Sequence, residues 1–349
     1  MINRRKFLFL SGSGLLASNL LAAKNLSPQT VGVYDSVPNQ KAILVPKRLR
    51  EGSKIAITAP ASPTSMGEIS KGVKTFKSLA CDVVVGDTIA KQGNNYRYFS
   101  APEDERVTEL MGFIEDESVD AIVRGRGGYG VMRILDKLDY DIIRKNPKII
   151  IGFSDITALL NAVYAKSGLV SYHGPVASSS FNSFTTSHLK DMFFTTENLK
   201  FESNSALIMQ EGVTEGMLVG GNLKMIVSTL GTPYEIDTTD AILFLEDVGE
   251  HPYMIDRMLT QLRLAGKLDT CKGFVFGIFK NMNERKPFFP NYSYTIKEVV
   301  EQLIVPYGKP VLMNMPIGHI ENKITLPIGI NAILNANKKF IELVENPVV

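Results

Sequence analysis

The sequence predicts an α/β protein built on a parallel sheet. Three apolar runs of strand length, 55–58, 120–123 and 148–151, alternate with stretches whose apolar residues recur at helical spacing. Such alternation is typical of parallel strands with helices on both faces of the sheet. The 349 residues are enough for two domains, and the 44% hydrophobic and 21% charged fractions are ordinary for a globular protein.

The elements of the first half follow one another closely. After the strand at 55–58, segment 102–116 places Val107, Leu110, Met111 and Ile114 on one helical face. The strand at 120–123 runs into glycines, and a helix is expected through Ile134 and Leu135. The strand at 148–151 ends at Gly152 and leads to a helical pattern at Ile156, Leu159, Leu160 and Val163.

The second half is predicted to form a separate domain. Between 177 and 212 the apolar pattern lapses into Ser, Thr, Asn and Phe, which indicates a linker. The pattern restarts at 216–223, and strands are then expected at 242–245 and 274–279, a helix around 255–262, and a turn- and strand-rich end from 311 to 333. We therefore expect domains at 53–180 and 213–349, joined by a linker at 181–212.

The N-terminus is expected to direct export. Asn3-Arg4-Arg5-Lys6-Phe7-Leu8 is a twin-arginine pair, followed by an apolar stretch that ends in Leu21-Ala22-Ala23. This pattern predicts a Tat-type signal peptide at 1–23, with a membrane anchor as the alternative, and 24–52 is expected to be a tether. The mature protein is thus predicted to be periplasmic. A net charge of +2 argues against nucleic acid or anionic membranes as partners.

Ser154 is the first candidate nucleophile. It stands two residues after an apolar strand and just before a helical pattern, at the carboxyl end of a sheet where α/β enzymes place their chemistry. The alternative is that Ser154-Asp155 only caps the helix, since both residue types are favoured there.

A nucleophilic serine needs a base, and the chain has four histidines: His173, His188, His251 and His319. His319 follows a glycine after an apolar strand, where a side chain can point into a cleft, whereas the other three are weaker candidates. Glu246 directly follows Ile242-Leu243-Phe244-Leu245 and can orient an imidazole. Taken alone, Glu246 is better explained as a solvent-facing charge at a strand end.

The segment Arg124-Gly125-Arg126-Gly127-Gly128-Tyr129-Gly130 formally matches G-x-G-x-x-G. A dinucleotide site would need an acidic residue at the end of the next strand, and that strand ends at Gly152 without one. We expect these glycines to expose backbone amides for an oxyanion instead. No H-E-x-x-H motif or Cys/His cluster is present, and the two cysteines, Cys81 and Cys271, are expected as buried thiols, so neither metal nor cofactor is predicted.

Several blocks together resemble one enzyme family over about 54–334. They are Arg126 to Gly130, Gly152-Phe153-Ser154-Asp155, His173-Gly174-Pro175, Gly220-Gly221-Asn222-Leu223, Leu230-Gly231-Thr232-Pro233, Leu245-Glu246-Asp247, Ile255-Asp256-Arg257-Met258-Leu259, Gly318-His319 and Leu326-Pro327-Ile328-Gly329. In this order they resemble the LD-carboxypeptidases, or murein tetrapeptide carboxypeptidases, of peptidase family S66. The microcin C immunity peptidases belong to the same family.

The resemblance implies a catalytic Ser154, Glu246 and His319, with the amides of Asp155 and of Gly127 or Gly128 as oxyanion hole. It implies a parallel-sheet nucleophile domain at the N-terminus and a smaller β-rich α/β domain at the C-terminus that supplies Glu and His. The implied substrate is a murein tetrapeptide that loses its terminal D-alanine, and Arg126 is the nearest cation by sequence for the carboxylate. Hydrolysis of another peptide-like amide and a non-enzymatic muropeptide-binding role are the alternatives. A homodimer is left open.

Overall fold

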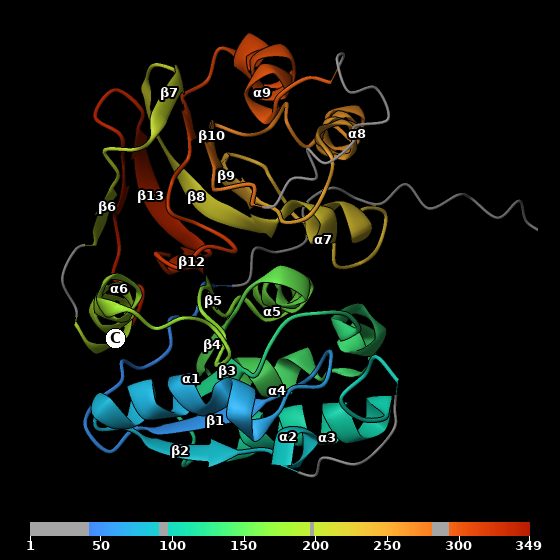
Figure 1. Cartoon of the computed structure of the whole chain (residues 1–349), viewed down its shortest axis with the longest axis vertical. Helices are drawn as coiled ribbons and strands as arrows, with labels where there is room; N and C mark the ends of the chain where they lie inside the picture. The colour runs from blue at the N-terminus through green and yellow to red at the C-terminus, as the bar shows by residue number, and fades with distance from the viewer. Residues whose placement is uncertain (1–41, 91–96, 196–198, 281–292) are drawn as a thin grey trace, which may run out of the picture. The chain divides into compact units, whose positions relative to one another are not determined.

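The computed structural model describes residues 42–90, 97–195, 199–280 and 293–349, and two sheets dominate them. The first sheet has the strand order β12-β5-β4-β3-β1-β2. Its strands are β1 (Lys54–Thr58), β2 (Asp82–Val85), β3 (Ala121–Arg124), β4 (Ile149–Gly152), β5 (Ser171–His173) and β12 (Leu326–Ile328). Neighbouring strands run parallel except β12, which pairs antiparallel with β5. The predicted parallel sheet is confirmed (Figure 1).

The helices of the first sheet are short, and their ends follow the local sequence. They are α1 (Met66–Ser78), α2 (Asp87–Ala90), α3 (Glu103–Glu115), α4 (Tyr140–Lys145), α5 (Thr157–Ser167) and α6 (Ser183–Phe194). A capping box of Ser65 and Glu68 starts α1, and Gly168, in the left-handed region with φ 73°, ends α5. The segment through Ile134 and Leu135 forms a 3₁₀ helix, η1 (Val131–Lys137), rather than the expected α-helix.

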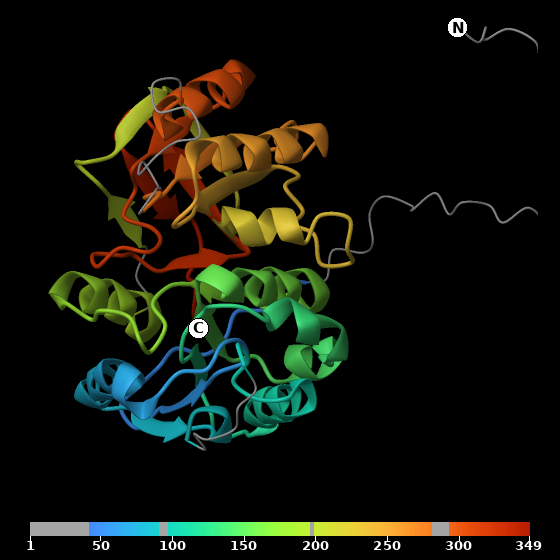
Figure 2. The same ribbon diagram turned by 45° about the vertical axis from the view of Figure 1, so that its right-hand side comes forward.

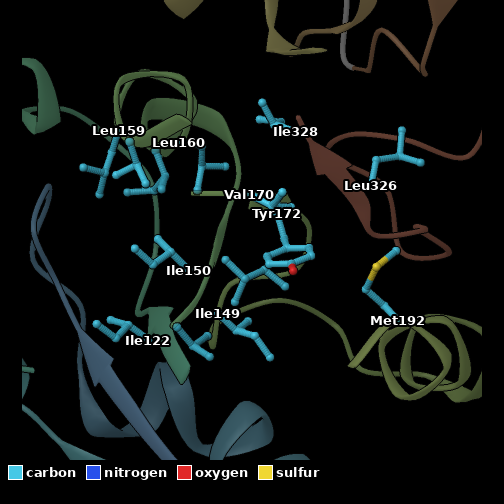
Figure 3. Packing of buried hydrophobic residues seen from close by; sticks show 14 of the residues in the cluster. Ile122, Ile149, Ile150, Leu159, Leu160, Val170, Tyr172, Met192, Leu326 and Ile328 are labelled. Carbon is cyan, nitrogen blue, oxygen red and sulfur yellow. The ribbon is translucent and has the colours of Figure 1, made fainter. Parts of the chain in front are cut away.

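Strand β4 is buried on both faces, which explains its unbroken run of isoleucines. Figure 3 shows Ile150 beneath Leu159 and Leu160 of α5, with Tyr172 of β5 nearby. The same core holds Leu326 of β12, which comes from the far end of the chain. Apolar burial on this scale is the main force that holds the sheet and its helices together.

The second sheet is mixed and has the order β6-β14-β13-β8-β9-β10-β11-β7. Its strands are β6 (Lys200–Glu202), β7 (Leu207–Gln210), β8 (Val213–Asn222), β9 (Ala241–Glu246), β10 (Gly273–Phe276), β11 (Val311–Met313), β13 (Ile330–Asn335) and β14 (Phe340–Leu343). Strands β8 to β11 are parallel to one another, and the outer strands pair antiparallel. Three helices gather on one side of this sheet: α7 (Leu223–Ser228), α8 (Pro252–Leu264) and α9 (Ile296–Leu303), the last followed by η3 (Val305–Tyr307) (Figure 2).

Two parts of the chain differ from the expected organisation. Segment 181–212, expected as a linker, contains α6, β6 and β7, because a small apolar face of Leu189, Met192 and Phe193 is buried within the polar sequence. Residues 42–52 of the expected tether also pack onto the fold, where Leu49 is buried and its amide donates to the Phe193 carbonyl (2.7 Å). The predicted signal peptide at 1–23 lies outside the described residues. None of the described helices is long and apolar enough to cross a membrane.

Helix α5 joins the two sheets, lying against β8, and so positions the site. Its first residue, Thr157, accepts a hydrogen bond at Oγ1 from the Asn222 amide at the end of β8 (3.1 Å). One turn later, Asn161 Nδ2 donates to the Gly220 carbonyl (3.1 Å). The carboxyl end of β4 is thereby tied to the carboxyl end of β8, which runs beside β9.

Candidate active site

Ser154 sits on a strained turn between β4 and α5. It opens a 3₁₀ turn, η2 (Ser154–Ile156), with φ +63°, a left-handed conformation that non-glycine residues rarely adopt. Neither η2 nor α5 has a side-chain cap, so Ser154 is not the helix cap that the local sequence allowed. The turn leaves the serine hydroxyl available at the strand end.

The glycine loop after β3 lies directly against this serine. A Cβ added to Gly127 would meet Ser154 Cβ at 2.9 Å and Oγ at 3.1 Å, so only glycine lets the two segments approach so closely. The next residue, Gly128, has φ +100° and also lines the cavity in front of Ser154. The two loop residues expected to carry oxyanion amides are therefore next to the candidate nucleophile.

The Asp155 carboxylate faces away from that cavity. It is 3% exposed and accepts a hydrogen bond from the Val131 amide (2.9 Å), which anchors the start of η1. Burial raises the pKa of Asp155 to about 6, although the Val131 amide and the Arg106 charge lower it. The side chain of Asp155 thus braces the turn, and only its backbone amide is left for a role in catalysis.

Glu246 and His319 are brought together from distant parts of the chain. Glu246, the last residue of β9, is fully buried, and its Oε2 lies 2.8 Å from His319 Nδ1. A Cβ added to Gly318, which has φ +109°, would lie 2.5 Å from the same oxygen. With Nδ1 held by the carboxylate, His319 Nε2 is the nitrogen left to exchange a proton with a substrate or nucleophile.

Asn222 and His173 surround the second oxygen of Glu246. Asn222 Nδ2 donates to Glu246 Oε1 (3.4 Å) and to Asp247 Oδ1 (3.1 Å). His173 Nε2 lies 4.0 Å from Glu246 Oε1, and its ring packs edge-on against Phe244 and Phe153. Complete burial lowers the pKa of His173 to about 4, so the ring is neutral near pH 7.

Ser154 and His319 line one cavity of about 350 Å³. The cavity is also lined by Arg126, Gly127, Gly128, Lys280, Glu321 and Lys323. No hydrogen bond joins Ser154 to His319 within the described part of the chain; catalytic hydrogen bonds often tighten only when substrate binds. Arg126 is half exposed and pairs with Glu68 (3.6 Å) at the cavity edge.

The other two histidines lie elsewhere. His188 packs on the Phe184 ring of α6 (4.4 Å between centroids), and His251 stacks on Tyr253 at the start of α8 (5.7 Å). Neither lines the cavity. The described residues contain no cluster of three or more His, Cys, Asp or Glu able to hold a metal ion. Cys81 and Cys271 are buried free thiols.

Sequence reasoning missed two residues of this site. Asn222 belongs to the Gly220-Gly221-Asn222-Leu223 block, but nothing in the pattern pointed to its bonds with two carboxylates. Lys323 follows His319 by four positions and lines the cavity, and no pattern in the sequence singled it out. The one available signal was its place between the candidate base and the apolar strand at 326–328.

Comparison with known proteins agrees with this architecture. Residues 55–174 match a family model described as the LD-carboxypeptidase N-terminal domain, and residues 215–334 match the LD-carboxypeptidase C-terminal domain. A probable murein peptide carboxypeptidase of Bacillus subtilis is 37% identical over 300 residues, covering 84% of this chain and 92% of that protein. The microcin C7 self-immunity protein MccF of Escherichia coli is 27% identical over 326 residues, covering 82% of this chain and 91% of that one.

A solved structure has the same fold. The muramoyltetrapeptide carboxypeptidase from Oxalobacter formigenes superposes with a TM-score of 0.74 and 31% identity, covering 83% of this chain and 98% of that one. The α/β fold with two sheets is therefore shared with a carboxypeptidase. This chain belongs to the LD-carboxypeptidase family, peptidase family S66, and is a hydrolase of the carboxypeptidase class.

Proposed function

We propose that this protein is a serine-type LD-carboxypeptidase that removes the terminal D-alanine from murein tetrapeptides. The observation that carries the proposal is the 2.8 Å contact between Glu246 and His319 at a cavity that Ser154 also lines. A buried carboxylate that holds one imidazole nitrogen leaves the other nitrogen to act as general base. The murein substrate is supported by the names of relatives in Bacillus subtilis and Oxalobacter formigenes.

In the proposed reaction, Ser154 Oγ attacks the carbonyl carbon of the bond between the L-diamino acid and D-alanine. His319 Nε2 takes the hydroxyl proton as the new C–O bond forms, and Glu246 stabilises the resulting imidazolium. The tetrahedral intermediate collapses by breaking the C–N bond, and His319 passes its proton to the leaving nitrogen. Water, activated by His319, then hydrolyses the acyl-enzyme and restores the Ser154 hydroxyl.

The negative charge on the tetrahedral intermediate needs donors beside Ser154. We propose the amides of Asp155 and of Gly127 or Gly128. This assignment is supported by the close approach of Gly127 to Ser154 and by the engagement of the Asp155 side chain with Val131. Donors held in place by folded backbone stabilise the charge without having to reorganise.

The test is mass spectrometry of defined tetrapeptides incubated with wild type and with Ser154→Ala. Wild type should release one alanine and leave the tripeptide, and Ser154→Ala should lose nearly all of this activity. Equal release by the two proteins would contradict the serine mechanism. Parallel substrates with L-lysine or meso-diaminopimelate at the third position would identify the preferred diamino acid.

A second candidate is hydrolysis of a peptidyl-nucleotide amide, because the microcin C7 self-immunity protein is 27% identical over most of its length. The proposed chemistry at Ser154 is the same, and only the group beyond the scissile bond differs. Cleavage of an aminoacyl sulfamoyl nucleoside together with no release of D-alanine would favour this candidate.

We further propose that residues 1–23 direct export by the twin-arginine route, so that the enzyme acts in the periplasm. The support is the Arg4-Arg5 pair and the apolar stretch after it. A fusion of residues 1–30 to a reporter that is active only after export should depend on both arginines. Export of an Arg4→Lys, Arg5→Lys fusion at the wild-type level would contradict the route.

A further inference from the structure

Two lysines of the described chain are buried, and the ammonium group of only one of them donates hydrogen bonds to the protein. Lys148 is 6% exposed, and its ammonium donates to the carbonyls of Asp116 (2.8 Å) and Val119 (2.6 Å). Lys323 is 5% exposed and lines the cavity in front of Ser154, and its ammonium makes no hydrogen bond to the described residues. An ammonium that lines a cavity and has no acceptor of its own is open to an anion that enters there.

The surroundings of Lys323 show where such a partner would bind. Its Nζ lies 5.3 Å from the centroid of the Phe153 ring, next to the candidate nucleophile, and the side chain lines the cavity with Ser154 and His319. Burial and the charge of Lys280, which lines the same cavity, together lower the pKa of Lys323 to about 8, although Glu246 and Glu321 raise it. Two like charges face one cavity, where an anion would relieve their repulsion.

The nearby carboxylates are not free to serve as that anion. Glu246, whose charge acts on Lys323, is bonded to His319 and Asn222. Glu321 lies on the exposed rim. A ligand carboxylate that enters the cavity is therefore the natural counter-charge for Lys323.

The direction of the proposed reaction places that carboxylate on the side of Lys323. The general acid must reach the leaving nitrogen, so the departing residue lies on the His319 side of the scissile bond. Its carboxylate is then only about 4 Å from the scissile carbon. Lys323 follows His319 on the same loop, whereas Arg126 belongs to the glycine loop on the oxyanion side and already pairs with Glu68.

We propose that Lys323 binds the terminal carboxylate of the peptide and so makes the enzyme an exopeptidase. The site takes the free α-carboxylate of the departing D-residue and rejects a chain that continues beyond it. This inference rests on the proposed function and adds to it a residue that determines specificity. Arg126 is left to contact the part of the peptide that stays on Ser154.

The test compares a tetrapeptide that ends in a free carboxylate with the same peptide ending in a carboxamide, on wild type, Lys323→Met and Lys323→Arg. Wild type should prefer the acid, and Lys323→Met should lower kcat/KM for the acid roughly 10- to 100-fold, mainly through KM, because a charged hydrogen bond is lost. Hydrolysis of the carboxamide should stay within about threefold of wild type. Lys323→Arg should restore part of the preference.

Two controls separate loss of recognition from loss of fold. Labelling of Ser154 by a fluorophosphonate, which carries no carboxylate, should proceed at the same rate in wild type and Lys323→Met. Lys272→Met removes a surface lysine that pairs with Asp240 (3.5 Å), and it should leave kcat/KM for both peptides unchanged. If Lys323→Met keeps the preference for the acid, or loses both substrates and the labelling together, the inference is wrong. If wild type releases neither D-alanine from the acid nor D-alaninamide from the carboxamide, the proposed function itself fails.

Discussion

Glu246 Oε2 lies 2.8 Å from His319 Nδ1, although 73 positions separate the two residues. The contact forms because β9 delivers Glu246 to the end of the second sheet, while β12 anchors the loop after His319 in the first sheet. A contact that depends on both sheets at once is sensitive to small changes in either residue, and this makes it a direct place to test the proposed chemistry.

Replacement of Glu246 by glutamine should lower kcat by roughly 10³- to 10⁴-fold, because a neutral amide neither selects the imidazole tautomer nor stabilises its cation. KM should change little. Glu250→Gln is the matched control, since Glu250 lies four residues further on and pairs with the exposed Lys224 (2.7 Å) instead of a histidine. Steady-state release of D-alanine measures both variants. A Glu246→Gln enzyme with near wild-type kcat would rule out the proposed role.

Gly127→Ala should lower activity far more than stability. The added Cβ would lie 2.9 Å from Ser154 Cβ and displace the turn that carries the hydroxyl. A misplacement of about 1 Å commonly costs on the order of 100-fold in rate. Gly112→Ala in α3 is the control: its Cβ meets nothing within 4 Å, and it should stabilise the helix by about 0.5–1 kcal/mol. Kinetics and thermal unfolding of both variants provide the comparison, and equal activities would contradict the expectation.

His173→Phe should make the free energy of unfolding fall less steeply as the pH drops below 6.5. The folded-state pKa of His173, about 4, lies below its ordinary value of 6.5, so the unfolded chain takes up a proton that the folded chain refuses. The free energy of unfolding should therefore fall as the pH drops from 6.5 towards 4, by up to about 3 kcal/mol from this residue. Urea unfolding at pH 7, 5.5 and 4.5 gives the free energy of unfolding at each pH. The same change of this free energy with pH in variant and wild type would contradict the prediction.

Asp155→Asn should remove a loss of stability that occurs as the pH rises, whereas the effect of His173 occurs as the pH falls. Its folded-state pKa, about 6, lies above the ordinary 3.8, so its contribution is fully present below about pH 3.8 and is lost as the pH rises through 6. An asparagine still accepts the Val131 amide and does not ionise. The free energy of unfolding of the variant should rise relative to that of wild type between pH 4 and 7, by up to about 3 kcal/mol at neutral pH. Chemical unfolding across that pH range measures this difference. A variant that becomes less stable than wild type as the pH rises would refute the prediction.

Part of the fold could be predicted from local patterns. The runs at 55–58, 120–123, 148–151 and 242–245 each coincide with a strand to within one residue at either end, because buried parallel strands are apolar on both faces. The helix and strands within 181–212 were not predicted, because α6 has few apolar residues among the polar ones of its exposed face. Strand β12 lies within the end that was expected to be rich in strands, but its antiparallel pairing with β5 of the first sheet could not be predicted from local patterns.

The sequence by itself determined the class of the fold and the position of Ser154 after β4, because hydrophobic periodicity and strand-to-helix order are local properties. The tertiary structure decided what surrounds that serine. It placed Gly127 against Ser154, joined Glu246 to His319 and left Lys323 buried without an acceptor. These relationships depend on how two sheets pack across α5, and contacts between residues so far apart in the chain leave no trace in local spacing.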